Sequence, residues 1–357
     1  MSAENRFAAK DLVEFATGVL SAGGMEDEKA RAVAQTLVDG DLLGHDTHGL
    51  ALLEPYMDQI ENRLMTLAGS PEVIKEAGAS MLWDGKRLPG PWLMNLGYEA
   101  LKHKARAQGT ATLVIRDAHH IACLASHLHR ASDDGFLMLI ASSDPTVQSV
   151  APHGGTQAVF TPNPIAASIP TSEAPFLVDI SSSITTLSMA RRLKENNQTF
   201  SENCLLDNTG RASNDPKDLW TTPAGSMLPL GGMHYGHKGF GLALTIEALT
   251  TGLAGRGRAD PNLLTGGWAA TVFISLFDLD AFGGNEAFRR QTDWLAQTCR
   301  ANVPRPGVDQ VRMPGDRSQA LRERQMIEGV ALHPTIIPAL QRCSARYGVE
   351  LPRSQET

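Results

Sequence analysis

A histidine in a short polar break is the residue of this sequence best suited to acid–base chemistry. Residues 44–49 read Gly-His-Asp-Thr-His-Gly and separate two stretches with helical apolar spacing. An imidazole that faces a cleft can give and take a proton near neutral pH, and the carboxylate of Asp46 would orient the ring of His48 and favour its protonated form. The alternative is a histidine that only caps a helix end or lies on the surface.

Two more histidines, His119 and His120, follow directly on an expected strand and precede an expected helix. In α/β proteins such positions often present ligand-binding groups. Adjacent residues of an extended segment point to opposite sides, and His127 and His129 fall on different faces of the helix. These side chains therefore do not converge on one point, and we expect no metal site.

Glycines and a lysine make residues 228–241 a candidate phosphate site. Leu-Pro-Leu-Gly-Gly is followed by Gly-His-Lys-Gly-Phe-Gly, which leads into an apolar helix. Glycines allow close approach of the backbone, free N–H groups at a helix start attract phosphate, and Lys238 adds a positive charge. The alternative is a flexible loop followed by close helix packing at Gly239 and Gly241.

Several well-known motifs are missing from the sequence. There is no G-x-G-x-x-G and no G-x-x-x-x-G-K-[S/T], which disfavours an ordinary Rossmann enzyme and a P-loop ATPase. The absence of H-E-x-x-H and G-x-S-x-G likewise disfavours a zincin and an α/β-hydrolase. Residues 311–317, Val-Arg-Met-Pro-Gly-Asp-Arg, form a turn with solvated charges when taken alone.

Charge and composition exclude several classes of protein. The net charge is −7, with 32 Lys and Arg against 39 Asp and Glu, which argues against nucleic-acid binding. The longest apolar runs are far shorter than a bilayer span, and no signal peptide opens the chain. The four cysteines lie far apart without a C-x-x-C pair, as expected for reduced thiols. We therefore expect a cytoplasmic protein without a membrane segment.

Apolar periodicity predicts helices at both ends of the chain around a β-rich centre. Helical spacing is found at residues 12–20, 26–44, 50–64, 121–134, 236–253 and 286–301, and in two further helices, the last starting at His333-Pro334. Short β-prone runs occupy residues 111–116, 136–142, 158–170, 176–181 and 268–282. The polar residues 193–226 are expected to form a long surface excursion. This pattern indicates an α+β or mixed α/β fold.

Together, the motifs resemble those of the type 2 malate/L-lactate dehydrogenase family of NAD(P)-dependent 2-oxoacid and ketimine reductases. Residues 46–49 resemble its D-S-H-G motif, with Thr47 in place of serine, and residues 118–120 stand where the family has S-N-H. The remaining matches are to N-P-I-A at 163–166, D-M-(A/S) at 179–181, L-P-L-G-G…K-G-Y-G-L at 228–241 and R-x-P-G-E-R at 312–317. It is the order of the set, over most of the chain, that is specific.

The resemblance implies a non-Rossmann α/β fold of α+β type. In it, a central and largely antiparallel sheet binds the nicotinamide cofactor, and helices from both chain ends flank the sheet. We therefore expect a helical part formed by residues 1–75 and 310–357, which carries the catalytic histidine. An interleaved sheet domain is expected at residues 76–309. The resemblance also implies a homodimer.

The implied activity is hydride transfer between NAD or NADP and C2 of a small 2-oxo or 2-hydroxy acid or a cyclic ketimine. His48 would be the proton donor and acceptor, with Thr47 and Asp46 beside it, and Tyr56 and Leu52 stand at substrate positions. The positions of the family's cofactor contacts are held by His120, Asp179, Ile180, Ser181, His237, Lys238, Pro314, Gly315 and Asp316. No cation for the ribose 2′-phosphate of NADP can be assigned.

One departure from the family concerns the substrate carboxylate. The family's arginine four residues after the histidine is replaced by Leu52, which cannot pair with a carboxylate. Arg63, Arg116 or Arg191 could replace it, and the sequence selects none of them. A second hypothesis is therefore a diverged member with weak or no catalysis that binds a nucleotide or metabolite as a sensor. A third is a histidine-rich metal hydrolase.

Overall fold

A seven-stranded sheet forms the centre of the computed structural model, which describes residues 6–260 and 266–355. In spatial order its strands are β2 (Glu72–Ala77), β3 (Ser80–Asp84), β4 (Thr110–Ala118), β11 (Ala270–Asp278), β5 (Phe136–Ser143), β6 (Pro164–Ile169) and β7 (Phe176–Ser181). All neighbours pair antiparallel except β3 and β4. The prediction of a mixed α/β fold with a largely antiparallel central sheet is confirmed.

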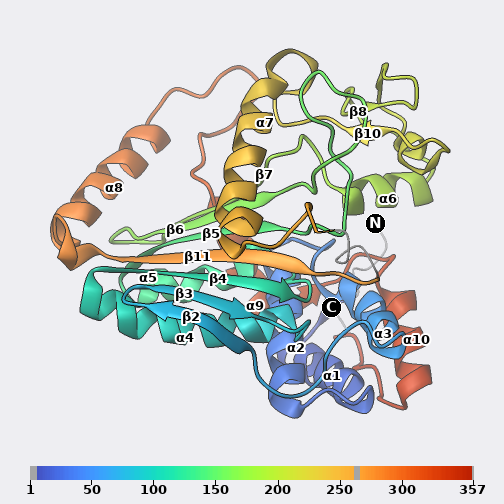
Figure 1. Cartoon of the computed structure of the whole chain (residues 1–357), viewed down its shortest axis with the longest axis horizontal. Helices are drawn as coiled ribbons and strands as arrows, with labels where there is room; N and C mark the ends of the chain where they lie inside the picture. The colour runs from blue at the N-terminus through green and yellow to red at the C-terminus, as the bar shows by residue number, and fades with distance from the viewer. Residues whose placement is uncertain (1–5, 261–265, 356–357) are drawn as a thin grey trace.

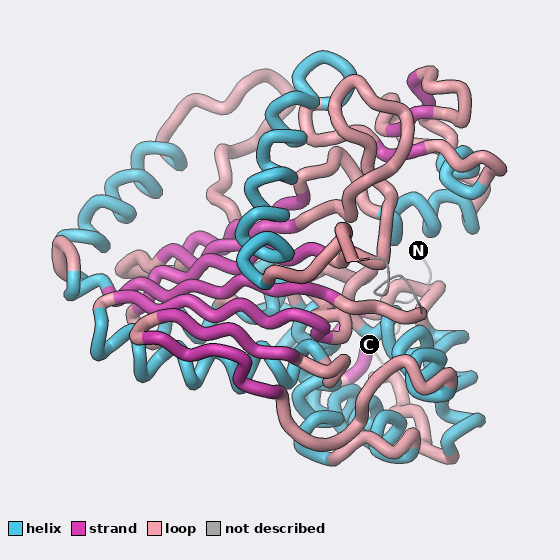
Figure 2. Tube along the Cα trace, viewed as in Figure 1, coloured by secondary structure: helices cyan, strands magenta, loops and turns pink. Residues whose placement is uncertain are grey.

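Helices cover both faces of this sheet (Figures 1 and 2). Helix α4 (Gly90–Gln108) packs on one face against β4 and β11, and α7 (Gly232–Glu247) lies on the other face against β5. The central strand β11 is therefore buried along almost its whole length, which explains its nearly continuous apolar sequence. At the far end, α8 (Asn285–Arg300) follows β11 along the outside of the molecule.

The two ends of the chain build a second hydrophobic core beside the sheet. The helices there are α1 (Ala9–Ala22), α2 (Asp27–Leu42), α3 (Leu53–Glu61), α9 (Asp316–Glu328) and α10 (Ile337–Tyr347). Leu20 and Leu37 from the N-terminal helices are fully buried in one cluster with Leu340 of α10. The short strand β1 (Arg6–Phe7) also pairs with β12 (Val330–Ala331). The predicted return of the terminal helices is confirmed, as the adjacent blue and red helices of Figure 1 show.

The predicted helix at 121–134 is wrong. The chain instead makes a 3₁₀ turn, η2 (Leu124–His127), and one short helix, α5 (His129–Asp133). Ala122 has a φ of 60° and its N–H donates to a ring nitrogen of His120, while the N–H of Ala125 donates to the Asp179 carboxylate. Side chains that capture backbone N–H groups in this way compete with helix formation.

Other boundaries also differ from the prediction. Helix α7 begins at Gly232, four residues before the predicted start, and α10 begins at Ile337 instead of at His333-Pro334. The predicted excursion at 193–226 contains a three-stranded sheet of β8 (Leu205–Leu206), β9 (Ala212–Ser213) and β10 (Ser226–Met227), which follows helix α6 (Leu187–Glu195). Strands β2 and β3 and helix α4 had no counterpart in the prediction. Strand β2 is exposed at every position, so it lacks the alternating pattern of a half-buried strand.

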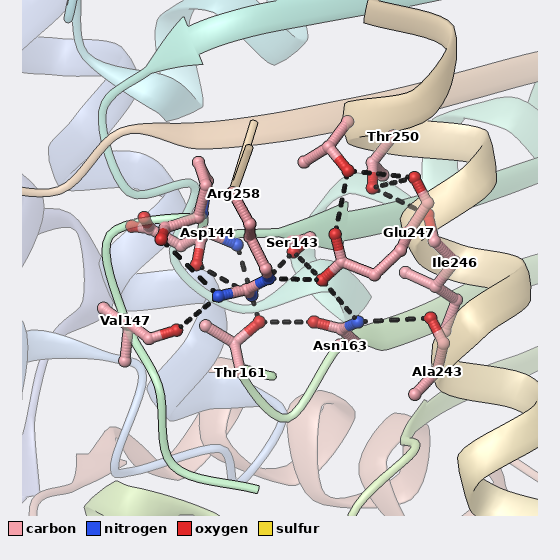
Figure 3. A network of polar contacts seen from close by, with 12 residues as sticks. Ser143, Asp144, Val147, Thr161, Asn163, Ala243, Ile246, Glu247, Thr250 and Arg258 are labelled. Atoms are coloured by element: carbon pink, nitrogen blue, oxygen red, sulfur yellow. Dashed lines mark hydrogen bonds and ion pairs between the residues drawn. The ribbon is translucent and has the colours of Figure 1, made fainter. Parts of the chain in front are cut away.

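A partly buried ion pair fastens the end of α7 to the sheet (Figure 3). The Glu247 carboxylate accepts hydrogen bonds from Arg258 Nε at 3.0 Å, Ser143 Oγ at 2.7 Å and Asn163 Nδ2 at 3.0 Å. The Arg258 guanidinium also donates to the carbonyl of Val147 at 2.9 Å. Asn163 has a φ of 42°, and its amide is bonded within this network, so the Asn-Pro motif serves to fix the start of β6.

We predict that Glu247→Gln lowers the free energy of unfolding by about 3 kcal/mol, because Arg258 would keep its charge in a poorly hydrated place without a counter-charge. Urea unfolding measures the change. The matched control is Glu72→Gln, which removes an exposed pair with Lys86 and should cost less than about 1 kcal/mol. Equal losses in the two variants would contradict the stabilising role of the network.

No helix in the described part of the chain has a stretch that is both long and apolar enough to cross a membrane.

Candidate active site

The turn that carries His48 is pressed onto the end of α2. The carboxyl group of Asp41, a buried residue of α2, accepts the N–H of Leu50 at 2.7 Å. A Cβ atom at Gly49 would lie 2.4 Å from this carboxyl group, and one at Gly40 would lie 3.1 Å from the carbonyl oxygen of His48. Only glycine therefore fits at position 49, which explains the last residue of the Asp-Thr-His-Gly motif.

His48 itself is partly buried and electrically neutral at neutral pH. Its Nδ1 lies 3.0 Å from the hydroxyl oxygen of Thr47. The pKa of His48 is lowered to about 4, chiefly by burial and also by the neighbouring His45, while the Asp46 carboxylate acts in the opposite direction. A neutral imidazole is equipped to accept a proton, and it would need added negative charge nearby to act as a donor.

The ring of His120 stacks on that of His48, with ring centroids 6.0 Å apart. His120 Nδ1 accepts the N–H of Ala122 at 3.1 Å and lies 2.8 Å from the hydroxyl of Tyr56. The pKa of His120 is lowered to about 3, chiefly by burial and also by its neighbour His48. Because a backbone N–H can only donate, Nδ1 is an acceptor and the proton of the neutral ring lies on Nε2. Tyr56 of α3 thus links the helical core to the segment after β4.

Two aromatic neighbours complete this cluster. The Trp268 ring lies 5.1 Å from that of His120 and 5.3 Å from that of His119. His119 is fully buried, and burial lowers its pKa well below the ordinary value. Trp268 was not predicted to belong to the site, because a tryptophan at the start of a predicted strand carries no signal for a site.

Asp46 is paired with an arginine that the sequence analysis missed. Its Oδ2 accepts a hydrogen bond from Nη1 of Arg192 in α6 at 2.9 Å. The adjacent Arg191, one of the candidates from the sequence, has an exposed side chain, and only the structure distinguishes these two arginines. The carboxylate next to His48 is therefore already balanced by a cation.

The other arginines that the sequence offered, Arg63 and Arg116, make no such contact with the turn that carries His48. Arg116 pairs with Asp84 at 3.1 Å, and Arg63 is exposed. Leu52 lies partly buried against the core of the terminal helices. Among these candidates and their neighbours, Arg192 is the one that the fold brings to the His48 turn.

Asp179, in strand β7, holds the loop after β4. Its carboxylate accepts the N–H of Ala125 at 3.0 Å and the thiol of Cys123 at 3.8 Å. His45 completes a group whose polar atoms all lie within 4.8 Å of one another. Burial raises the pKa of the Cys123 thiol, so the thiol is protonated and donates to the carboxylate. We interpret the group as hydrogen-bonded and retain the absence of a metal as a prediction.

The remaining positions on β7 and before α9 lie along one edge of the sheet. Ile180 is 44% exposed on this edge strand, and the Ser181 hydroxyl donates to the carbonyl of Ser183. Pro314 accepts the N–H of Leu177, so residues 314–316 run beside β7. Gly315, with a φ of 95°, precedes α9, and Asp316 in its first turn pairs with Arg300 at 2.7 Å.

His237 and Lys238 were expected in the glycine-rich start of a helix at 236–253, and the structure starts this helix earlier, at Gly232. Both are exposed residues inside α7. A Cβ at Gly239 would lie 2.4 Å from the backbone nitrogen of Leu230 and 2.7 Å from the carbonyl oxygen of Ser182, so this glycine serves close helix packing. The N–H of Gly232 donates to the carbonyl of Pro229, but the first turn of α7 has no side-chain cap, which leaves the N–H groups of Met233 and His234 for a ligand.

We predict that Asp41 lowers the free energy of unfolding as the pH rises, because the buried side chain resists ionisation. Burial raises the pKa of Asp41 to about 8, so between pH 4 and 8 the folded chain holds a proton that the unfolded chain releases. Asp41→Asn keeps an acceptor for Leu50 and cannot ionise. Its stability relative to the native protein should therefore improve by about 1 kcal/mol per pH unit between pH 5 and 7. Urea unfolding at several pH values tests this, and a constant difference would contradict it.

Comparison with known proteins agrees with the motifs. The family model for malate/L-lactate dehydrogenase matches residues 7–341. An L-lactate dehydrogenase of Cupriavidus necator is 28% identical over 352 residues, which cover 95% of this chain and 97% of that protein. A malate dehydrogenase of Pyrococcus horikoshii is 26% identical over 348 residues, which cover 95% of this chain and 94% of that protein.

Solved structures share the fold. The malate dehydrogenase from Entamoeba histolytica is 23% identical and has a TM-score of 0.91, covering 98% of this chain and 99% of that chain. The Δ1-piperideine-2-carboxylate reductase from Pseudomonas syringae is also 23% identical, with a TM-score of 0.82 over 95% of this chain and 99% of that chain. The resemblance stated from the motifs is thus confirmed, and the protein belongs to the malate/L-lactate dehydrogenase family of oxidoreductases.

Proposed function

We propose that this protein reduces a small 2-oxoacid or cyclic ketimine, and oxidises the product in reverse, with His48 as proton donor and acceptor. The observation that carries the proposal is the neutral His48 ring between Thr47 and His120. The names of the relatives support a hydroxy-acid substrate, and the name of one structural neighbour, a Δ1-piperideine-2-carboxylate reductase, suggests the ketimine.

Thr47 orients the catalytic ring in this proposal. When neutral His48 acts as a base, its Nδ1–H donates to the Thr47 hydroxyl oxygen, and Nε2 is left to take the proton from the substrate hydroxyl. In reduction the same Nε2 returns the proton to the substrate oxygen or nitrogen. His120, held by the Tyr56 hydroxyl, supports the ring of His48 from the other side.

The cofactor proposed is NAD or NADP, and the described residues fit it. Residues 179–181 offer an exposed apolar side chain on an edge strand, and residues 314–316 run beside them. The uncapped start of α7, with Lys238 in its second turn, suits a pyrophosphate. His237 and His120 belong to the same proposed contact set. When bound, the nicotinamide exchanges a hydride with C2 of the substrate.

We further propose a cytoplasmic homodimer, as the family resemblance implies. Its helical part would be residues 1–75 and 310–357, and the cofactor part residues 76–309.

The first test measures oxidation of NADH and NADPH with a panel of 2-oxoacids and Δ1-piperideine-2-carboxylate. The native protein should turn over at least one of them. His48→Gln should lower kcat by about 10²- to 10⁴-fold without changing the dissociation constant of NADH, because only the proton transfer is lost. His103→Gln, on an exposed position of α4, is the matched control.

A diverged, non-catalytic binding protein is the second candidate, and Leu52 is the observation that favours it. Binding of NADH and acids without turnover across the panel, unaffected by His48→Ala, would establish this second candidate.

The low pKa of His48 also predicts how the rate depends on pH. Above a pKa of about 4 the protonated fraction of His48 falls about tenfold per pH unit. The kcat/KM for reduction should therefore fall with this slope from pH 5 to 8, whereas kcat/KM for oxidation, which needs neutral His48, should not decline as the pH rises. Initial rates in both directions measure the profiles. A reduction profile that is flat from pH 5 to 7 would contradict the assignment.

A further inference from the structure

The substrates proposed above carry a carboxylate, and this inference rests on that proposed function. A carboxylate taken out of water needs a cation or several N–H donors, because its unpaired burial is costly. Leu52 supplies neither from its side chain, so a partner for the carboxylate must come from elsewhere in the fold.

Arg192 has both the position and the free hydrogen-bond donors to bind a substrate carboxylate. Its side chain is only 19% exposed and reaches Asp46, which lies two residues before His48. Within the described residues it makes this one hydrogen bond, through Nη1, so its other N–H donors are free of protein partners. A guanidinium can bind a carboxylate through two parallel hydrogen bonds, and this one has the spare donors to do so.

Other arginines of the central part are engaged by different groups. Arg116 pairs with Asp84, Arg256 with Asp117 at 3.0 Å, and Arg258 is bonded to Glu247 and backbone carbonyls. Because these guanidinium groups hold the sheet and its loops, they are poorly placed to change partners.

Helix α6 itself is lightly anchored, which suits a residue that exchanges partners. Ala190 is its one buried residue, and the Arg192–Asp46 pair joins it to the His48 turn. Lys194, further along, lies over the ring of Trp220 in the neighbouring 3₁₀ turn.

We propose that Arg192 binds the carboxylate of the substrate, and that Asp46 holds the guanidinium in the free protein and gives it up when substrate enters. In the free protein the Asp46 carboxylate occupies the place on the Arg192 guanidinium that the substrate carboxylate would take beside His48. The exchange leaves the guanidinium paired throughout and adds one negative charge near His48. Arg192 therefore selects acids over their neutral analogues.

The experiment compares the 2-oxoacid with the highest kcat/KM in the panel with its C1 methyl ester. Arg192→Met removes the charge but keeps the length of the side chain. It should raise KM for the acid by about 10- to 100-fold, the effect of losing a charge-assisted hydrogen bond, and leave the ester unchanged. Arg192→Lys should recover part of the loss. Arg191→Met, on an exposed neighbouring position of the same helix, is the matched control and should behave as the native protein.

A merely structural role for Arg192 would give a different result. If Arg192→Met lowered kcat for acid and ester equally, or if it matched Arg191→Met, the proposal would be overturned. Thermal unfolding of each variant shows whether α6 keeps its fold.

Binding of oxamate, measured by calorimetry with NADH present, separates this inference from the proposed function. If the native protein reduces no acid but binds oxamate and loses that binding in Arg192→Met, the proposed function fails and the carboxylate site stands. If Arg192→Met binds oxamate as well as the native protein, or neither binds it, the site is overturned. Asp46→Asn, which removes the competing carboxylate, should bind oxamate more tightly, and unchanged or weaker binding would contradict the exchange.

Discussion

The candidate active site depends on one junction, where the stacked rings of His48 and His120 meet beneath the hydroxyl of Tyr56. His48 comes from the turn after α2, and His120 from the segment after the sheet strand β4. The core of the terminal helices and the sheet therefore meet at this place. The N–H of Ala122 donates to Nδ1 of His120 and so fixes the tautomer of that ring, and the Tyr56 hydroxyl at the same nitrogen helps to fix its position.

The same burial that builds the junction sets its electrostatics. Both rings are neutral at neutral pH because they have lost hydration, and Asp41 holds the base of the turn as a protonated carboxyl. A neutral His48 is a base and must take up a proton before it can act as the proton donor in reduction. A negative charge nearby would favour this uptake. In our proposal the carboxylate of the substrate supplies it, by displacing Asp46 from Arg192. Substrate binding and proton uptake would then be coupled.

Local pattern predicted much of the fold. The terminal helices and the strands β4, β5, β7 and β11 were visible because their apolar spacing is regular. The helix predicted at 121–134 failed because side chains of His120 and Asp179 take backbone N–H groups, and no local pattern reveals a partner 54 residues away. Strand β2 was not predicted, because all its residues are exposed and it has no apolar alternation.

Those residues of the candidate site that stand close together in the sequence could be proposed from the sequence. The residue types at Asp46, Thr47, His48 and Gly49 made an acid–base turn one of two interpretations, and the family resemblance favoured it and added Tyr56 and Asp179. Arg192 could not be found in this way, because 146 residues separate it from its partner Asp46 and a second arginine stands beside it. Choosing between Arg191 and Arg192 requires knowing which side of α6 faces the turn.

The most direct measurement of the central claim follows a labelled hydrogen. A single turnover with NADH or NADPH carrying deuterium at the transferable position of C4 is analysed by mass spectrometry of the product. The account predicts one deuterium at C2 of the hydroxy or amino acid formed by the native protein, with the product appearing far more slowly in His48→Gln. Unlabelled product, or equal rates in the two proteins, would contradict it.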